Sequence, residues 1–456
     1  MFRLNRPNWT LSGQLGLNIK KILEESKAAG TYKTERVIVS AQGSDIKIPS
    51  VSKNSPLRTV SNFCANNYLG LSNHPALISA AKATLDSHGF GLSSVRFICG
   101  TQDIHKELEH RIAEFHGKEA AILYPSCFDA NTGFFEAILG PNDAIFSDEL
   151  NHASIIDGIR LCRAGTKQRY RHLDYADLEE KIARSVDTGP ADQVRLIVTD
   201  GVFSMDGDIA RLDKLHAIKS KFPNTYLFVD ECHATGLLGH GGKGTPGIFN
   251  VQPDVINSTL GKALGGATGG YTAASHEIVD LLRQRARPYL FSNTVAPSVV
   301  GASLKVLDIV EGKDSGTSGT ELQGKLAANT LYFRKSMVDA GFAVLGNDAC
   351  PIVPVLIGDA KTSAEVAEGL LDRGIYVVSF SYPVVPKDQA RIRVQISASH
   401  TKAQLSKAVA GFISVGKEFG ILQLYTSAAF DKHTETGRRL AQQEDAGEWD
   451  DILKKS

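Results

Sequence analysis

The sequence lacks an excess of either charge. Its 456 residues contain 50 Lys and Arg against 50 Asp and Glu, so the formal net charge is zero. Proteins that bind nucleic acid or anionic membranes mainly through charge carry a surplus of clustered Lys and Arg. We therefore expect neither nucleic acid nor a membrane as a partner. A local basic patch for a phosphorylated ligand remains compatible with this balance.

Long apolar runs and paired cysteines are also absent. A long uncharged stretch, residues 288–304, contains two prolines, an asparagine and three serines. A membrane-spanning helix needs about 20 mostly apolar residues, so this stretch is not one. The six cysteines are scattered and form no CxxC pair. This usage is typical of a large protein in a reducing compartment and excludes a disulfide scaffold.

The amino terminus is basic and carries no acid before Glu24, whereas Arg3, Arg6, Lys20 and Lys21 precede it. A mitochondrial presequence has this composition. A short solvated tail before the first helix has it too, and both interpretations stay open. We expect the mitochondrial matrix as the location, with the cytoplasm as the alternative.

Two changes in composition divide the chain. The polar segment SVSKNSPLR covers residues 50–58, and EGKDSGTSGT covers residues 311–320. Segments rich in Gly, Ser and Thr are typical of connections between larger units. The predicted units are an amino-terminal extension with a helix and strand arm (1–58), a large domain (59–310), a smaller α+β domain (311–423) and a charged tail (424–456).

In the large unit, short β-branched apolar runs alternate with helical patterns. This alternation predicts an α/β fold with a mostly parallel sheet between helices. Ligands of such sheets gather at the carboxyl ends of the strands. The predicted strands cover residues 120–124, 143–147, 196–199, 226–229, 255–258 and 270–274. In the smaller unit we predict helices at 322–340, 360–373 and 402–419 and strands at 352–357, 375–380 and 390–396.

A glycine-rich segment directly after a predicted strand carries a single lysine, Lys262. A lysine among small and apolar residues favours the neutral amine, which can attack an aldehyde. The neighbouring glycines let a bulky ring approach the backbone. A nucleotide-binding P-loop is excluded, because Ile256 and Ala263 occupy the positions of its first glycine and its hydroxyl residue. A Schiff-base lysine and an ordinary glycine-rich turn remain as alternatives.

The strand at 226–229 is followed by Asp230 and, three residues later, by His233. A carboxylate buried at a strand end needs a cationic partner, and a protonated pyridine nitrogen is one such partner. At about 4 Å and an effective dielectric constant of about 20, their attraction is about 4 kcal/mol. The alternative is a helix-capping aspartate with a surface histidine. A metal site is disfavoured because no second pair of ligands follows.

Two further features suit the same small molecule. Residues 124–129 lie between a predicted strand and a helix, where backbone amides and the helix dipole favour a phosphate. His152 follows the next strand and is significant only together with the other residues. Combined with Lys262, Asp230 and His233, these features predict pyridoxal 5′-phosphate bound as a lysine Schiff base.

Eight segments within residues 15–423 resemble the α-oxoamine synthases, enzymes that depend on pyridoxal phosphate and join an amino acid to an acyl-CoA. The resemblance implies fold type I, like aspartate aminotransferase, with a mostly parallel seven-stranded sheet. The blocks RPYLFSN and YPVVPK resemble the branch that uses acetyl-CoA. The eight segments cover residues 62–75, 94–109, 126–133, 148–162, 199–210, 259–274, 283–297 and 382–401.

The resemblance also implies a reaction: glycine plus acetyl-CoA gives 2-amino-3-oxobutyrate plus CoA. In cells it would run in reverse, completing threonine breakdown after a threonine dehydrogenase. The catalytic residues implied are Lys262, which binds the cofactor and takes the substrate Cα proton, and Asp230, which pairs with the pyridine nitrogen. His233 and Ser204 would hydrogen-bond the phenolic oxygen of the cofactor ring. His152 would stack on that ring and face the substrate.

The cofactor phosphate would be bound from two subunits of a homodimer. The resemblance assigns the backbone amides of Cys127 and Phe128, together with Thr259, to one subunit. Ser292 and Asn293 would reach the same phosphate from the partner subunit. Shared active sites of this kind make the homodimer a requirement for activity.

Asn66 and Arg393 would hold the substrate carboxylate, with Arg393 as a bidentate fork. Sibling synthases that use another acyl-CoA, such as 5-aminolevulinate synthase and 8-amino-7-oxononanoate synthase, share Lys262, Asp230 and His233 and remain an alternative. A non-catalytic subunit is disfavoured, because such a protein has no need of Lys262. The sequence departs from the family pattern in reading DECHATG after the strand at 226–229, although Asp230 and His233 keep their places.

Overall fold

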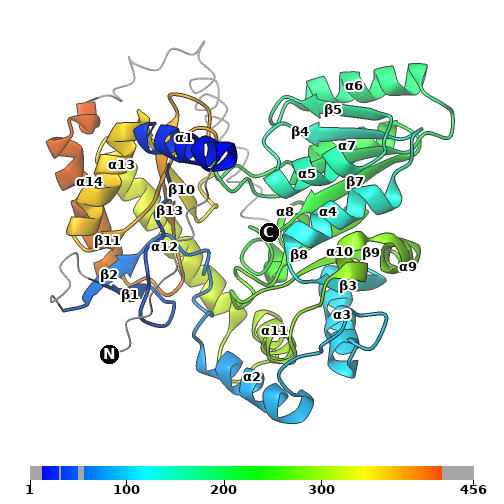
Figure 1. Cartoon of the computed structure of the whole chain (residues 1–456), viewed down its shortest axis with the longest axis horizontal. Helices are drawn as coiled ribbons and strands as arrows, with labels where there is room; N and C mark the ends of the chain where they lie inside the picture. The colour runs from blue at the N-terminus through cyan, green and yellow to red at the C-terminus, as the bar shows by residue number, and fades with distance from the viewer. Residues whose placement is uncertain (1–12, 30–31, 50–55, 424–456) are drawn as a thin grey trace.

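The computed structural model describes residues 13–29, 32–49 and 56–423 (Figure 1). The first twelve residues of the basic amino terminus and the predicted tail at 424–456 lie outside the described residues. None of the described helices is long and apolar enough to cross a membrane. Figure 1 shows a large sheet on the right and smaller sheets on the left, where α12 (Gly319–Asp339) runs beside the smaller sheets.

The largest sheet has seven strands in the order β3-β9-β8-β7-β6-β4-β5. Its central pairs are parallel, and β9 is antiparallel to both of its neighbours. The predicted α/β fold with a mostly parallel seven-stranded sheet is therefore confirmed. The strands are β3 (Ala120–Tyr124), β4 (Ala144–Asp148), β5 (Thr166–Tyr170), β6 (Arg195–Asp200), β7 (Thr225–Asp230), β8 (Val255–Thr259) and β9 (Gly270–Ala274).

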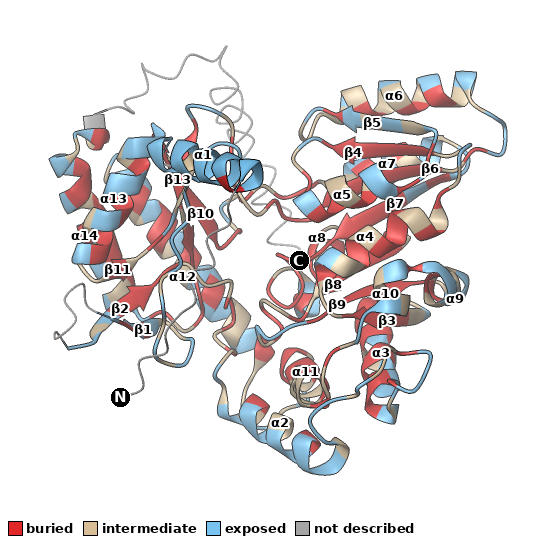
Figure 2. Cartoon of the chain, viewed as in Figure 1, coloured by how far each residue is buried: buried red, intermediate tan, exposed pale blue. Residues whose placement is uncertain are grey.

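Both faces of this sheet are buried, and Figure 2 shows β4, β6 and β7 buried along most of their length. Because successive side chains of a strand point to opposite faces, Phe228 packs in one apolar cluster while Leu227 and Val229 pack in another. The helices of this part are α2 (Pro75–His88), α3 (Asp103–His116), α4 (Cys127–Ile138), α5 (Ala153–Leu161), α6 (Tyr175–Thr188), α7 (Leu212–Lys221), α8 (Thr245–Phe249), α9 (His276–Arg285), α10 (Arg287–Phe291) and α11 (Pro297–Val310).

A second, antiparallel sheet has the order β10-β13-β12, and its strands are β10 (Ile352–Gly358), β12 (Ser379–Phe380) and β13 (Ala390–Gln395). The helices packed around it are α12, α13 (Ala360–Asp372) and α14 (Lys402–Glu418). A third sheet consists of β1 (Asp45–Ile48), β2 (Arg58–Asn62) and β11 (Ile375–Tyr376). The remaining helix, α1 (Gln14–Ala28), begins the described chain.

The prediction of one strand over residues 375–380 was wrong. This segment forms β11, which pairs with β2, and β12, which pairs with β13. The β-branched and aromatic composition correctly predicts an extended backbone. Composition cannot indicate that the two halves find their partners in different sheets. The division of the chain into four units stays a prediction.

At the carboxyl edge of the large sheet, His172 forms ion pairs with Asp148 and Asp208. His172 follows β5, and its Nδ1 lies 2.8 Å from Asp148 Oδ1 at the end of β4. Its Nε2 lies 3.2 Å from Asp208 Oδ2. Burial lowers the pKa of His172, but the charges and hydrogen bonds of the two carboxylates outweigh burial and raise the pKa from 6.5 to about 10.

These ion pairs predict that stability falls as the solution becomes alkaline. A group whose pKa is raised by folding stabilises the protein fully below its unfolded pKa, and the effect is lost as the pH rises through about 10. We expect the apparent free energy of unfolding to fall by about 4 kcal/mol between pH 6.5 and pH 10. Urea titrations across this range measure the slope. In His172→Gln, most of this decrease in the free energy of unfolding with pH should be absent. Equal slopes in the variant and the wild type would contradict the prediction.

Candidate active site

Three predicted site residues lie at or just beyond the carboxyl ends of neighbouring strands. Asp230 ends β7 and Thr259 ends β8, while Lys262 follows β8 by three residues. Asp230 is in register with Asp200, the last residue of β6. Strand order alone therefore brings a lysine and two carboxylates to one edge of the sheet, where α/β proteins bind their ligands.

Asp230 is buried and held by neutral groups. Its Oδ2 accepts a hydrogen bond of 2.6 Å from Asn131 Nδ2, and its Oδ1 accepts one of 2.9 Å from the backbone N–H of Cys232. Asn131 lies on α4 and in turn accepts a hydrogen bond from Asn257 Nδ2 at 2.8 Å. Asp230 makes no ion pair with any residue of the described chain. A buried carboxylate without a cation fits a cationic ligand.

The charge of Lys262 acts on two other predicted site residues, His233 and His152. Burial lowers the pKa of His233, and the charges of Lys262 and Arg393 lower that pKa further. Although part of the His152 side chain is exposed, desolvation by the surrounding protein atoms lowers its pKa, which the charge of Asp230 raises and that of Lys262 lowers. Lys262 itself is half-buried in the single chain. The small and apolar residues around it in the sequence led us to expect stronger shielding from water.

His233 is oriented by Tyr68, whose Oη lies 2.8 Å from His233 Nδ1. Tyr68 is fully buried, and burial raises its pKa, so the phenol keeps its proton. With the phenol as donor to Nδ1, the neutral imidazole carries its proton on Nε2 and can donate it to a ligand. The Tyr68 hydroxyl also lies 3.5 Å from Asn66 Oδ1, which brings Asn66 to the same group.

The predicted phosphate turn lies at the amino terminus of α4. The Ser126 hydroxyl caps the helix by accepting the N–H of its third residue at 3.1 Å. The N–H groups of Cys127 and Phe128 therefore have no partner within the helix. Thr259 lies across the strand ladder from Gly270, and a Cβ atom on Gly270 would clash with the Cys127 backbone nitrogen. Glycine at position 270 thus allows β9 to pack directly against this turn.

Arg393 reaches the site from β13 of the second sheet. Its Nη1 donates a hydrogen bond of 3.1 Å to the backbone oxygen of Ser204, and its guanidinium lies 4.8 Å from the centre of the Phe380 ring. Its Nε is buried without a partner in the described chain. Burial lowers the pKa of Arg393, which nevertheless stays charged at neutral pH. A half-buried guanidinium that has no carboxylate partner among the described residues fits a carboxylate ligand.

Three predicted site residues, His152, Ser292 and Asn293, are exposed in the single chain. His152 caps α5, and its Nδ1 lies 2.7 Å from Ser154 Oγ. Ser292 and Asn293 follow α10 on the surface. No hydrogen bond or ion pair of the described chain joins them to Lys262 or Asp230. The roles assigned to these residues stay predictions.

Cys127, Asp230 and Cys232 are buried, and their ligand atoms lie within 4.8 Å of one another. Interaction with Cys232 and burial raise the pKa of the Cys127 thiol, and burial raises that of Cys232. Protonated thiols are poor metal ligands, and a structural zinc site needs four ligands. We therefore interpret this cluster as part of the buried lining of the candidate site and not as a metal site.

Sequence reasoning missed two residues that hold predicted ones in place. Tyr68 and His233 are 165 positions apart, and no spacing rule joins them. Asn131 could have been identified from the sequence, because it is a polar residue on the same apolar face of α4 as Ala130 and Phe134, and all three are buried. Buried polar side chains need partners, so a polar residue at such a position indicates a nearby polar site.

Residues 58–412 match the family model of the class I and II aminotransferases. A mitochondrial 2-amino-3-ketobutyrate coenzyme A ligase of Homo sapiens is 55% identical over 402 residues, which cover 88% of this chain and 92% of that protein. The ligase of the same name from Escherichia coli K12 is 52% identical over 414 residues, covering 90% and 100%.

A solved structure of serine palmitoyltransferase from S. paucimobilis, with bound PLP and myriocin, superposes with a TM-score of 0.80 at 26% identity. The match covers 89% of this chain and 98% of that chain. The similarity thus extends through both sheets that contribute residues to the candidate site.

Proposed function

Because this chain belongs to the aminotransferase class I and II family, within the group of the 2-amino-3-ketobutyrate coenzyme A ligases, we propose that it is a glycine C-acetyltransferase. It interconverts glycine plus acetyl-CoA and 2-amino-3-oxobutyrate plus CoA. The structural observation that carries the proposal is Asp230, a buried carboxylate that forms no ion pair within the described residues and acts on the same groups as Lys262. A lysine for the Schiff base and an aspartate for the pyridine nitrogen are the pair of groups with which enzymes bind pyridoxal phosphate.

The residues at the strand ends fit pyridoxal 5′-phosphate. Lys262 would bind its aldehyde, Asp230 would hold the proton of its pyridine nitrogen, and the turn at Cys127 and Phe128 would bind its phosphate. Thr259 borders that turn and adds a hydroxyl. When bound, the cofactor supplies a ring that accepts electron density from the substrate Cα.

The other residues then have distinct tasks. Arg393 would hold the glycine carboxylate together with Asn66, which fixes the Cα beside the Lys262 amine. Lys262 would take the Cα proton, which glycine does not lose unaided in water. His233, with its proton placed on Nε2 by Tyr68, and Ser204 would hydrogen-bond the phenolic oxygen of the cofactor, while His152 would cover the ring.

We further propose that the enzyme is a homodimer in which Ser292 and Asn293 reach the partner's phosphate site. Both residues are exposed in the single chain, beside Phe291, which is 67% exposed. Asn293 forms an isolated β-bridge with Val95, two residues before Phe97, which is 62% exposed. Large apolar side chains gathered on a surface mark an interface. A second copy of this chain would cover them and complete the site.

The proposed setting is the breakdown of threonine to glycine and acetyl-CoA in the mitochondrial matrix, after a threonine dehydrogenase. The relative from Homo sapiens is a mitochondrial protein by name, whereas the bacterial relative is not. The basic amino terminus without an acid before Glu24 supports the mitochondrial location.

Measuring thiol release with glycine and a panel of acetyl-, succinyl-, malonyl- and palmitoyl-CoA tests the proposal. We expect acetyl-CoA to have the highest kcat/KM, by at least about tenfold over succinyl-CoA, which corresponds to about 1.4 kcal/mol in the transition state. Reactions without glycine serve as the control. Preference for a longer acyl group would indicate a sibling synthase instead. A colourless protein without activity that stays colourless with added cofactor would indicate a non-catalytic subunit.

A further inference from the structure

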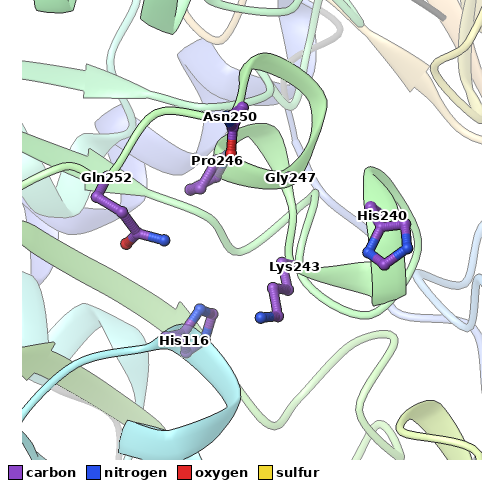
Figure 3. Close-up of a pocket in the computed structure, with 7 residues that line it drawn as sticks. All are labelled: His116, His240, Lys243, Pro246, Gly247, Asn250 and Gln252. Carbon is purple, nitrogen blue, oxygen red and sulfur yellow. The ribbon is translucent and has the colours of Figure 1, made fainter. Parts of the chain in front are cut away.

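A cavity outside the candidate active site lies between the end of α3 and the connection from β7 to β8 (Figure 3). Its volume is about 210 Å³. None of the residues that line it belongs to the site described above. They are His116, His240, Lys243, Pro246, Gly247, Asn250 and Gln252.

His116 borders this cavity with an unsatisfied nitrogen. The residue is 2% exposed, and its Nε2 lies 2.8 Å from the hydroxyl of Tyr271 on β9. Its Nδ1 is buried and has no partner in the described chain. Burial lowers the pKa of His116 to about 3, with further lowering by Lys118 and Lys243, so the ring is neutral. Since a buried polar atom is costly without a hydrogen bond, the missing partner points to a ligand.

Lys243 supplies an uncompensated positive charge. It is half-buried, and its ammonium makes no ion pair or hydrogen bond within the described chain. Figure 3 shows its side chain reaching toward the His116 ring, with the Gln252 amide extending toward the same space. A nearby carboxylate, Asp254, is already paired with Lys219 at 2.5 Å. The lining of the pocket therefore combines an ammonium group that is unpaired within the described residues with side chains that can form hydrogen bonds.

We propose that this pocket binds a small phosphate-bearing anion, either inorganic phosphate or a short phosphomonoester. The Lys243 ammonium faces the phosphate charge, and His116 Nδ1–H donates to one oxygen while Nε2 accepts from the Tyr271 hydroxyl. The amides of Asn250 and Gln252 donate at the rim. Pockets for drug-sized ligands measure about 300–1,000 Å³, so this one is too small for a whole acyl-CoA.

Binding here would connect three parts of the fold. His116 ends α3, Tyr271 lies on β9, and Lys243 belongs to the connection that follows Asp230 and His233. A ligand that binds only the folded state raises the thermal midpoint. The anion therefore stabilises the connection that leaves the candidate active site.

The test uses the full-length protein saturated with pyridoxal phosphate, so that the cofactor phosphate site is filled. Inorganic phosphate is titrated calorimetrically and in thermal unfolding, against chloride at equal ionic strength. We expect saturable binding and a higher midpoint. Lys243→Gln should weaken binding at least tenfold, and Gln252→Leu should weaken it severalfold. The control, Lys335→Gln, changes an exposed lysine of α12 and should leave binding unchanged.

Glycerol 3-phosphate and acetate distinguish the sources of the ligand. Tighter binding of glycerol 3-phosphate than of inorganic phosphate identifies a phosphomonoester, and the reverse identifies the free ion. Either result supports the proposal if Lys243→Gln weakens the binding. Equal binding of acetate overturns the phosphate assignment, and a response that follows ionic strength in every variant overturns the site itself. None of these readouts measures turnover, so they are independent of the proposed reaction.

Discussion

Lys262→Ala is expected to lower kcat for CoA release from glycine and acetyl-CoA by at least about 10³-fold. The variant lacks both the amine that binds the cofactor aldehyde and the base that takes the Cα proton. Positioned proton transfer alone contributes about 10²–10⁴-fold to a rate. Lys262 is half-buried in a glycine-rich loop, so its truncation leaves no large cavity, and the fold should persist. Steady-state thiol release and circular dichroism measure the two effects.

Lys262→Arg is the matched variant, because it keeps the positive charge that acts on His152 and His233 but has no nucleophilic amine. It should be as inactive as Lys262→Ala. Borohydride reduction of the wild-type holoprotein, followed by peptide mapping, should place the pyridoxyl group on residue 262. Activity within tenfold of wild type in either variant, or a label on another lysine, would show that the lysine is misassigned.

The sequence predicted the interior of the large sheet better than its edge. Strands such as β6 and β7 carry apolar side chains on both faces, so their composition indicates them without any knowledge of their neighbours. The edge strand β5 reads TKQRY and was missed, because its exposed face is polar and its burial comes from pairing with β4 alone. Local patterns thus identify strands rich in apolar residues, including the other edge strand β3, whereas a polar edge strand such as β5 depends on tertiary pairing.

The same distinction applies to the candidate site. Asp230 and Lys262 were found because each directly follows a recognisable strand, and parallel strands end at one edge. No spacing in the chain could have brought Arg393 to Ser204, since Arg393 lies on β13, Ser204 lies in the turn after β6, and the two are 189 positions apart. Its place at the site was predicted only through the resemblance to a family. The roles of all these residues stay predictions until variants are measured.

Arg393→Ala is expected to raise KM for glycine by at least about 10²-fold while KM for acetyl-CoA stays within about threefold. The guanidinium has a buried Nε without a partner in the described chain, and only its Nη1 is bound to the protein, through the Ser204 oxygen. A carboxylate held by two charge-assisted hydrogen bonds gains about 1.5–3 kcal/mol from each, which corresponds to at least 10² in affinity. Initial rates with each substrate varied in turn measure both constants.

Arg391 provides the control, because it lies two residues earlier on β13 but is fully buried and paired with Asp206 at 2.8 Å. Arg391→Gln should lower the free energy of unfolding by about 3–5 kcal/mol, since it removes one partner of a buried ion pair. Its effect on the ratio of the two KM values should be small. Arg393→Lys, which keeps the charge without the planar fork, should recover only part of the glycine affinity. Equal increases in both KM values for Arg393→Ala would instead mean that this arginine supports the shape of the site and does not bind the amino-acid carboxylate.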